Sequence, residues 1–350
     1  MINIDRHAAE MAMTFLLDDP SPRVRLSLAE ALADSRMAPR SIILSLSQDQ
    51  PEIAGAVILR SPVLTDADLV DLAARGTAET RALIALRPFV SRSVAAALAE
   101  IGGEEDILVL LDNVNACFSG RSLKRICERL GHLAEIRNRL LDRGDLPAAA
   151  RHALVEQVGA ALSCFGLARQ TIGSTRIERV TREACDVATV KIAETVEAAE
   201  MPALVEHLRV DGRLTPVFLM HALCTGKIDF FAAAIVNLSG CAEKRVRSIL
   251  ADGRMHAIRA LFESAGLGRD ISALFVDATL MWREQMKSGN EDSPASISTR
   301  LVRKFRDSES PLTASGGLLD LVEKLSIAEQ RQSARSYAQL AASQAEVQAA

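Results

Sequence analysis

Residues 19–32 of this 350-residue chain read DPSPRVRLSLAEAL, a turn that is followed by a helix with one apolar face. The Asp-Pro pair makes the turn. Val24, Leu28, Ala31 and Leu32 follow at positions i, i+4, i+7 and i+8, which places their side chains on one side of an α-helix. The segment therefore predicts a turn–helix unit whose apolar face must be buried against a neighbouring element.

The same pattern returns twice, as DQPEIA at 49–54 and as GTAETRALIAL at 76–86. The offsets are 29 residues from Val24 to Ile53 and 27 residues from Ile53 to Thr80. Shorter helices are predicted between these segments at 39–47, 65–74 and 91–101. Two short helices cannot bury both faces alone, so neighbouring pairs must stack. The turn resembles that of HEAT repeats, although those usually take about 40 residues, and an irregular helical bundle is the alternative.

Composition narrows the class of protein. Hydrophobic residues make up 49% of the chain, which is enough for a sizeable core, whereas aromatic residues make up 3%. So few aromatic residues disfavour a sheet and disfavour base-stacking platforms. The 41 basic and 45 acidic residues give a formal charge of −4, which excludes a strongly basic nucleic-acid coat. We expect no transmembrane segment, because no apolar run approaches the ~20 residues that span a bilayer.

A break in the pattern divides the chain. Gly166, Gly173 and Ser174 interrupt the helices, which predicts HEAT-like repeats over 1–165 and a second all-helical domain over 176–285. Residues 177–200 predict one long helix, and the helix at 217–224 is apolar on nearly all sides and so is expected to be buried. The fold class is therefore all-α, with a HEAT-like α-solenoid, a second helical-repeat or bundle domain and a mobile C-terminal tail.

The tail has a different composition from the rest. Residues 286–317 are rich in Ser, Gly and charge, which predicts a flexible linker, and residues 318–350 predict a partly exposed C-terminal helix. Within the linker lies a short basic amphipathic segment, and its members are a candidate interaction surface: Arg300, Arg303, Lys304, Phe305 and Arg306. We expect this tail to dock on a partner or on a second copy, and residues 1–285 to fold without it.

The second half carries a family resemblance. The segments GRLTP at 212–216, ALCTG at 222–226, Phe230-Phe231 and AGL at 265–267 resemble a bacterial family of HEAT-like helical proteins catalogued as a domain of unknown function. The resemblance covers residues 20 to 285 and is densest from 205 to 285. It implies an all-helical protein with no established activity, and it transfers no catalytic residue.

Motifs for chemistry are missing from the sequence. There is no GxxxxGK[ST], GxGxxG, GxSxG or HExxH, and no two histidines are spaced i, i+3 or i+4. We therefore expect no catalytic, cofactor-binding or metal-binding residues and no enzyme activity. His221 lies in an apolar helix and reads as a core histidine. The six cysteines form no CxxC pair and, with no signal peptide, are expected to be reduced in a cytoplasm.

One helix carries a row of cations, which we call the basic stripe: Arg121, Lys124, Arg125 and Arg129. The stripe is a candidate anion-binding surface, whereas the alternative is a solvated helix face that Glu128 partly neutralises. A second basic cluster at 244–259 is disfavoured as a DNA reader, because base-reading side chains are few there.

These patterns lead to one expectation about function. The leading hypothesis is a non-enzymatic scaffold or adaptor that binds another protein through the solenoid surface or the tail. The alternatives are nucleic-acid or nucleotide binding through the basic stripe and, less favoured, a helical enzyme whose site is assembled from scattered residues.

Overall fold

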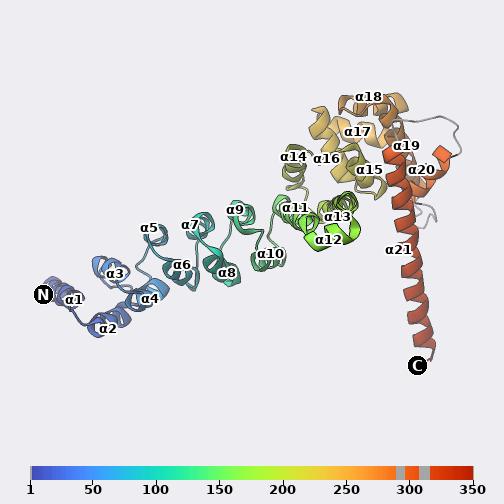
Figure 1. The fold of residues 1–350 in the computed structure, drawn as a ribbon. Helices are drawn as coiled ribbons and strands as arrows, with labels where there is room; N and C mark the ends of the chain where they lie inside the picture. Colours follow the sequence, from blue (N-terminus) through green and yellow to red (C-terminus); the bar gives the residue numbers. More distant parts are fainter. Residues whose placement is uncertain (1, 289–295, 307–315, 350) are drawn as a thin grey trace. The chain divides into compact units, whose positions relative to one another are not determined.

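The computed structural model describes residues 2–288, 296–306 and 316–349, and these form twenty-one α-helices and no strand (Figure 1). One isolated parallel bridge joins Val90 to Ala116. The expected all-α class is therefore confirmed. The chain divides into two compact units, which we call unit 1 (up to Thr171) and unit 2 (from Ile172). Among the described helices, none combines the length and the apolar character that crossing a membrane requires.

Unit 1 is built from short helices that pack on their second neighbours. Helix α2 packs on α4, α4 on α6, α6 on α8 and α8 on α10, while α5 packs on α7, α7 on α9 and α9 on α11. Odd and even helices thus form two rows (Figure 1). The helices are α1 (Ile2–Leu17), α2 (Pro22–Leu32), α3 (Arg40–Leu46), α4 (Pro51–Arg60), α5 (Asp66–Arg75), α6 (Ala78–Ala85), α7 (Arg92–Ile101), α8 (Glu104–Asp112), α9 (Gly120–Leu130), α10 (Ala134–Leu141), α11 (Ala148–Cys164) and α12 (Gly166–Ile172), which crosses the unit boundary.

The apolar face expected on residues 19–32 is mostly found. Leu28 is buried and Leu32 packs against the core, whereas Ala31 is exposed. The buried strip of α2 is instead centred on Leu28 and Ala29, because α2 contacts both α3 and α4 and these cover adjacent sides of the helix. The core that these residues begin is one continuous apolar cluster running through unit 1 to Leu154.

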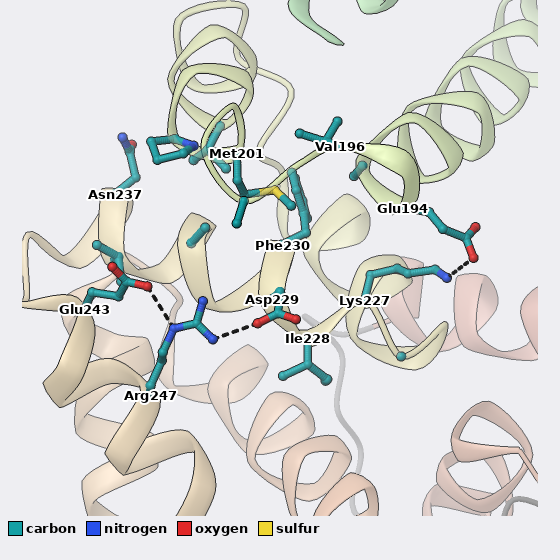
Figure 2. Close-up of a pocket in the computed structure, with 17 residues that line it drawn as sticks. Glu194, Val196, Met201, Lys227, Ile228, Asp229, Phe230, Asn237, Glu243 and Arg247 are labelled. Atoms are coloured by element: carbon teal, nitrogen blue, oxygen red, sulfur yellow. Dashed lines mark hydrogen bonds and ion pairs between the residues drawn. The ribbon is translucent and has the colours of Figure 1, made fainter. Parts of the chain in front are cut away.

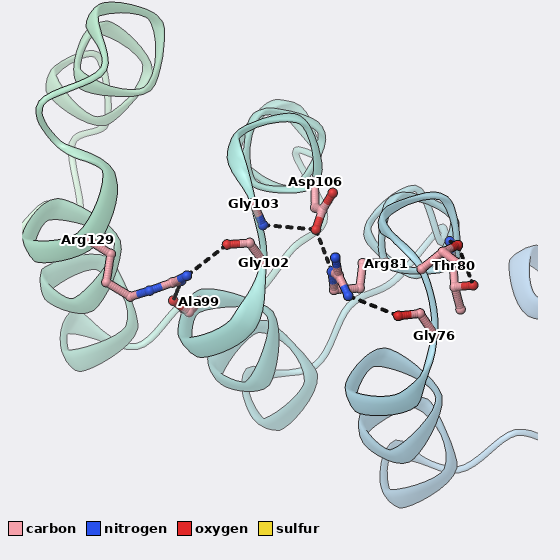
Figure 3. Close-up of polar contacts among 9 residues, drawn as sticks. Gly76, Thr80, Arg81, Ala99, Gly102, Gly103, Asp106 and Arg129 are labelled. Atoms are coloured by element: carbon pink, nitrogen blue, oxygen red, sulfur yellow. Dashed lines mark hydrogen bonds and ion pairs between the residues drawn. The ribbon is translucent and has the colours of Figure 1, made fainter.

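Charged side chains join helical pairs of unit 1 to one another, and we call these bonds interhelix latches. Each latch spans 24 to 28 residues of sequence, with donor–acceptor distances of 2.6 or 2.7 Å, in four pairs: Arg25–Asp49, Arg40–Asp68, Arg81–Asp106 and Arg139–Asp112. Figure 3 shows the most buried of them, in which Asp106 is 1% exposed. Its carboxylate accepts Arg81 Nε at 2.6 Å and the backbone N–H of Gly103 at 3.0 Å.

A second kind of latch caps the end of a helix. Arg129 of α9 donates to the carbonyls of Ala99 and Gly102, at 2.6 and 3.0 Å, where α7 ends (Figure 3). Such a side chain satisfies carbonyls that have no partner inside their own helix. Arg283 makes the same contact in unit 2, donating to the carbonyls of Leu250 and Gly253 at the end of its target helix. Unit 2 therefore contains at least one helix pair built like those of unit 1.

Unit 2 surrounds a central apolar helix, α15, whose side chains from Phe218 to Cys224 are all buried. Phe231, Phe262 and Phe275 form a ring cluster beside it, with centroids 5.8 to 6.0 Å apart. The helices are α13 (Ser174–Thr195), α14 (Met201–Val210), α15 (Pro216–Cys224), α16 (Ile228–Ser239), α17 (Glu243–Asp252), α18 (Met255–Ser264), α19 (Arg269–Ser288), α20 (Ile297–Arg306) and α21 (Gly316–Ala349). The expected burial of the helix at 217–224 is thus found from Phe218 onward, with Val217 at its exposed start.

The C-terminal segments differ from the expected mobile tail. Residues 297–306 form α20 rather than a linker, and the rest of the predicted linker lies largely outside the described residues. Helix α20 packs on α19 and α21, and α21 packs on α15. Leu301, Leu318 and Val322 are buried. We attribute this docking of the C-terminal helices to α15, because a helix that is apolar on all sides needs more cover than its neighbours in the sequence provide.

Candidate functional site

A groove of about 520 Å³ lies in unit 2 between the end of α13, the connection to α14, and helices α14, α16 and α17 (Figure 2). We call it the groove. Its apolar lining includes Val196, Met201, Val205, Phe230 and Ala233, of which Val205 and Phe230 are buried beneath the surface. Met201 and Phe230 both line the groove (Figure 2). Ligand sites in proteins have volumes of this order and a similar mixture of apolar walls and a few polar groups.

The local sequence explains how α16 comes to line the groove. After α15 the chain turns at Gly226, which has φ 76°, a left-handed conformation that favours glycine. The Gly226 N–H donates to the carbonyl of Leu223, and the Lys227 N–H donates to that of Ala222. These two bonds close the end of α15 as a Schellman motif. The reversal allows α16 to begin at Ile228 and to present Asp229 and Ala233 to the groove.

Ion pairs stand on the groove's edge. Lys227 Nζ lies 2.5 Å from Glu194 Oε1, and Arg247 lies 2.7 Å from Asp229 Oδ1 and 2.9 Å from Glu243 Oε1 (Figure 2). The hydrogen bonds to Asp229 and Glu243 raise the pKa of the Arg247 guanidinium. Both cations of the edge are therefore already paired with carboxylates, and they are less exposed than most of those carboxylates.

The edge carries more negative than positive charge. Three carboxylates line the groove, those of Glu194, Asp229 and Glu243, and we call them the acidic rim. Set against Lys227 and Arg247, they leave one excess negative charge among the lining residues. Each of the three is more exposed than the cation with which it pairs.

One wall of the groove is fixed by a polar network on α14 and α16. Asn237 Nδ2 donates to Glu206 Oε2 at 3.0 Å, and the same carboxylate accepts Arg209 through two bonds of 2.8 and 2.6 Å. The bonds from Arg209, and then from Asn237, lower the pKa of Glu206 to about 2. This network ties α14 to α16 on the side of the groove where Asn237 lies.

The basic stripe is largely neutralised within unit 1. Arg125 donates to both carboxylate oxygens of Glu100, at 2.7 and 2.8 Å, and Lys124 lies 3.9 Å from Glu128. Arg129 turns toward the carbonyls of α7 and acts as a latch. The structure does bring Arg121, Lys124 and Arg125 to one shallow pocket, but Glu100 and Glu128 share that pocket. The stripe is thus a mixed-charge surface rather than a continuous positive face.

The basic residues of the tail are also engaged, in this case within unit 2. Arg300 pairs with Glu284 at 2.6 Å, Lys304 pairs with Asp277 at 2.7 Å, and Arg306 pairs with Glu323. Arg303 is exposed, and Phe305 is half-buried. Three ion pairs of the candidate surface at 300–306 therefore attach α20 to its neighbours, while Arg303, Lys304 and Arg306 remain exposed.

Burial favours the neutral form of two core thiols, those of Cys127 and Cys224, and of the His221 imidazole. Burial raises the pKa of the Cys127 and Cys224 thiols to about 12 and lowers the pKa of His221. A thiol attacks as its thiolate, so these two cysteines are poor nucleophiles at neutral pH. His221 lies where a core histidine was expected, among the buried residues of α15.

Sequence reasoning did not find the groove. Its lining residues come from four helices and the connections between them. A partial signal was present, because Glu194 precedes the apolar Val196 and Met201 within one short segment.

A family model described as "uncharacterised protein conserved in bacteria (DUF2336)" matches residues 53–313. No curated protein and no solved structure matches the chain. The matched range includes the groove and most of the helical pairs of unit 1.

Proposed function

This chain belongs to the DUF2336 family of uncharacterised bacterial proteins, and we propose that it is a non-enzymatic helical-repeat adaptor that binds another protein. The groove in unit 2 is the observation on which the proposal rests most heavily. An adaptor needs a surface on which a partner can bury apolar side chains, and the groove offers an apolar floor with charged groups at its edge.

The packing of unit 1 supports a HEAT-like α-solenoid within this proposal. Most helices of unit 1 pack on a second neighbour, and the interhelix latches recur at offsets of 24 to 28 residues. Repeats that contact their neighbours in this way commonly form extended binding surfaces. None of the six cysteines, all of which lie in the described part of the chain, forms a disulfide, which is consistent with the reducing cytoplasm that we propose for the protein.

The state of the charged groups favours protein binding over the two alternatives. A nucleic-acid site needs a broad positive surface, whereas the basic stripe shares its pocket with two glutamates and the groove has an acidic rim. An enzyme of the third kind would need reactive groups, whereas Cys127 and Cys224 are held protonated and His221 neutral by burial.

Affinity purification of the full chain from the bacterium that encodes it tests the proposal. A protein should co-purify with the native chain and with Val210→Glu, and should be lost from Ala233→Glu, which places a charge on the groove floor. Val210 is the matched control, because it is an apolar side chain of α14 that is 68% exposed and does not line the groove.

Folding of each variant is checked by the emission of Trp282, the sole tryptophan, which lies in α19 of unit 2. The proposal fails if no protein co-purifies with the native chain above background. It fails equally if nucleic acid co-purifies in place of a protein and is released by nuclease treatment.

A further inference from the structure

We infer that the groove binds a basic amphipathic helix of the partner, with apolar side chains on the floor and Lys or Arg side chains on the acidic rim. This inference rests on the proposed function and names the chemistry of the partner segment. It follows from two separate properties of the groove, namely the apolar floor and the charge distribution around it.

The floor is suited to apolar side chains from another helix. Phe230 is buried beneath the groove, while Met201 and Ala233 are partly exposed in it (Figure 2). A methionine side chain is unbranched and polarisable, so Met201 can adjust to side chains of different shape. The walls are themselves helices, α14 and α16, and an amphipathic helix laid in a groove between helices is a recurrent mode of recognition.

The rim selects the sign of the charge that the ligand carries. Asp229 is 78% exposed and Glu243 is 65% exposed, whereas Lys227 is 25% exposed and already bound to Glu194. Each ionised carboxylate has about four acceptor sites, so these acids keep capacity for further donors after their bonds to Arg247 and Lys227. A ligand approaching the groove therefore meets carboxylates first.

A ligand with acidic side chains would meet the opposite situation. Its carboxylates would face the surplus negative charge of the rim, and like charges brought together at an interface cost several kcal/mol. Since Arg247 and Lys227 are both occupied, such a ligand would also have to break the existing ion pairs. The geometry thus favours a cationic partner segment on both counts.

The test uses two synthetic 18-residue helices as probes, and both carry leucines on one face. The opposite face carries lysines in the first probe, which we call the lysine probe, and glutamates in the second, the glutamate probe. The full chain carries ¹³C-methyl methionine, and the Met201 signal is assigned by its loss in Met201→Leu. Adding the lysine probe should shift the Met201 methyl signal and leave that of Met37 unchanged, because Met37 is exposed in unit 1.

Affinities then separate the two properties. The lysine probe should bind at least tenfold more tightly than the glutamate probe, and its affinity should fall as salt rises. Ala233→Phe, which fills the floor without changing charge, should weaken the lysine probe at least tenfold, whereas Val210→Phe should not. The double variant Asp229→Lys with Glu243→Lys should reverse the preference between the probes.

The inference is overturned if the Met201 signal does not move, or if the two probes bind equally. In that case, if a partner protein still co-purifies with the native chain and is lost from Ala233→Glu, the proposed function holds and only the cationic helix is rejected. If no protein co-purifies with the native chain, the proposed function itself fails, whatever the probes do.

Discussion

Replacing Asp106 with alanine should destabilise unit 1 by about 3 kcal/mol, because it removes one partner from a buried ion pair. The Asp106 carboxylate is 1% exposed and holds both Arg81 Nε and the Gly103 N–H. Without it, the Arg81 guanidinium and an N-terminal amide of α8 lose their acceptor in a place that water barely reaches. We choose the lower end of the usual range because Arg81 is 20% exposed and keeps its bond to the Gly76 carbonyl.

Native-state hydrogen exchange measures this effect where it should occur. A loss of about 3 kcal/mol should speed exchange of the slowest amides of α6 and α8 by about a hundredfold. The emission of Trp282 should give an unchanged urea transition, because it reports on unit 2. Asp112→Ala is the matched control, since its latch with Arg139 is about half exposed and should cost less than about 1 kcal/mol.

A double variant completes the argument about the latch. Arg81→Met with Asp106→Leu removes both charges and keeps apolar volume, so it should recover most of the loss. Equal effects of Asp106→Ala and Asp112→Ala would refute the reasoning, because burial would then make no difference to the value of a latch. The reasoning would also be refuted if the double variant were as unstable as Asp106→Ala. The lost free energy of unfolding would then not come from the unpaired Arg81 guanidinium, which the double variant lacks.

Three further results are expected. Leu301→Ala should lower the urea midpoint reported by Trp282 and reduce the free energy of unfolding by about 2–5 kcal/mol, because Leu301 is fully buried in unit 2. An unchanged midpoint would show that α20 does not contribute to the stability of unit 2. The pKa of Glu206 is lowered in the folded chain, so its stabilising effect is present above its ordinary value of 4.5 and is lost as the pH falls toward about 2. Titration of its carboxyl carbon by NMR should show this, and Arg209→Gln should move the pKa back up. Iodoacetamide at pH 8 should label Cys164, which is exposed, long before Cys127, whose buried thiol has a pKa of about 12; equal rates would contradict the burial of Cys127.

Local patterns in the sequence predict the helices well, because caps and apolar periodicity act within a few residues. Thr65 illustrates this, since its hydroxyl accepts the Asp68 N–H and the Asp68 carboxylate accepts the Thr65 N–H, as expected of a helix start. Gly166 and Gly173 interrupt the periodic pattern in the stretch where the structure divides into its two units, at Thr171.

Partners that lie far apart in the sequence could not be predicted in this way. Arg125 looked like part of a free basic face because Glu100, which neutralises it, lies 25 residues earlier on another helix. The same holds for α20, whose cations find Glu284, Asp277 and Glu323 on other helices. The groove was missed for the same reason, since its lining residues are spread over four helices between residues 193 and 247.

The interhelix latches also affect how unit 1 responds to a pulling force. Each helical pair is held to the next by local packing and by one or a few side chains, and no element of the described unit runs the whole length of the row to share the load. Tension applied to its ends should therefore open one helical pair at a time. A segment of 27 residues, the separation of Arg139 from Asp112, has an extended length of about 90–100 Å. Optical-trap records of this chain should accordingly show a ladder of small, similar extensions in place of one large rupture, so unit 1 would behave as a soft molecular spring.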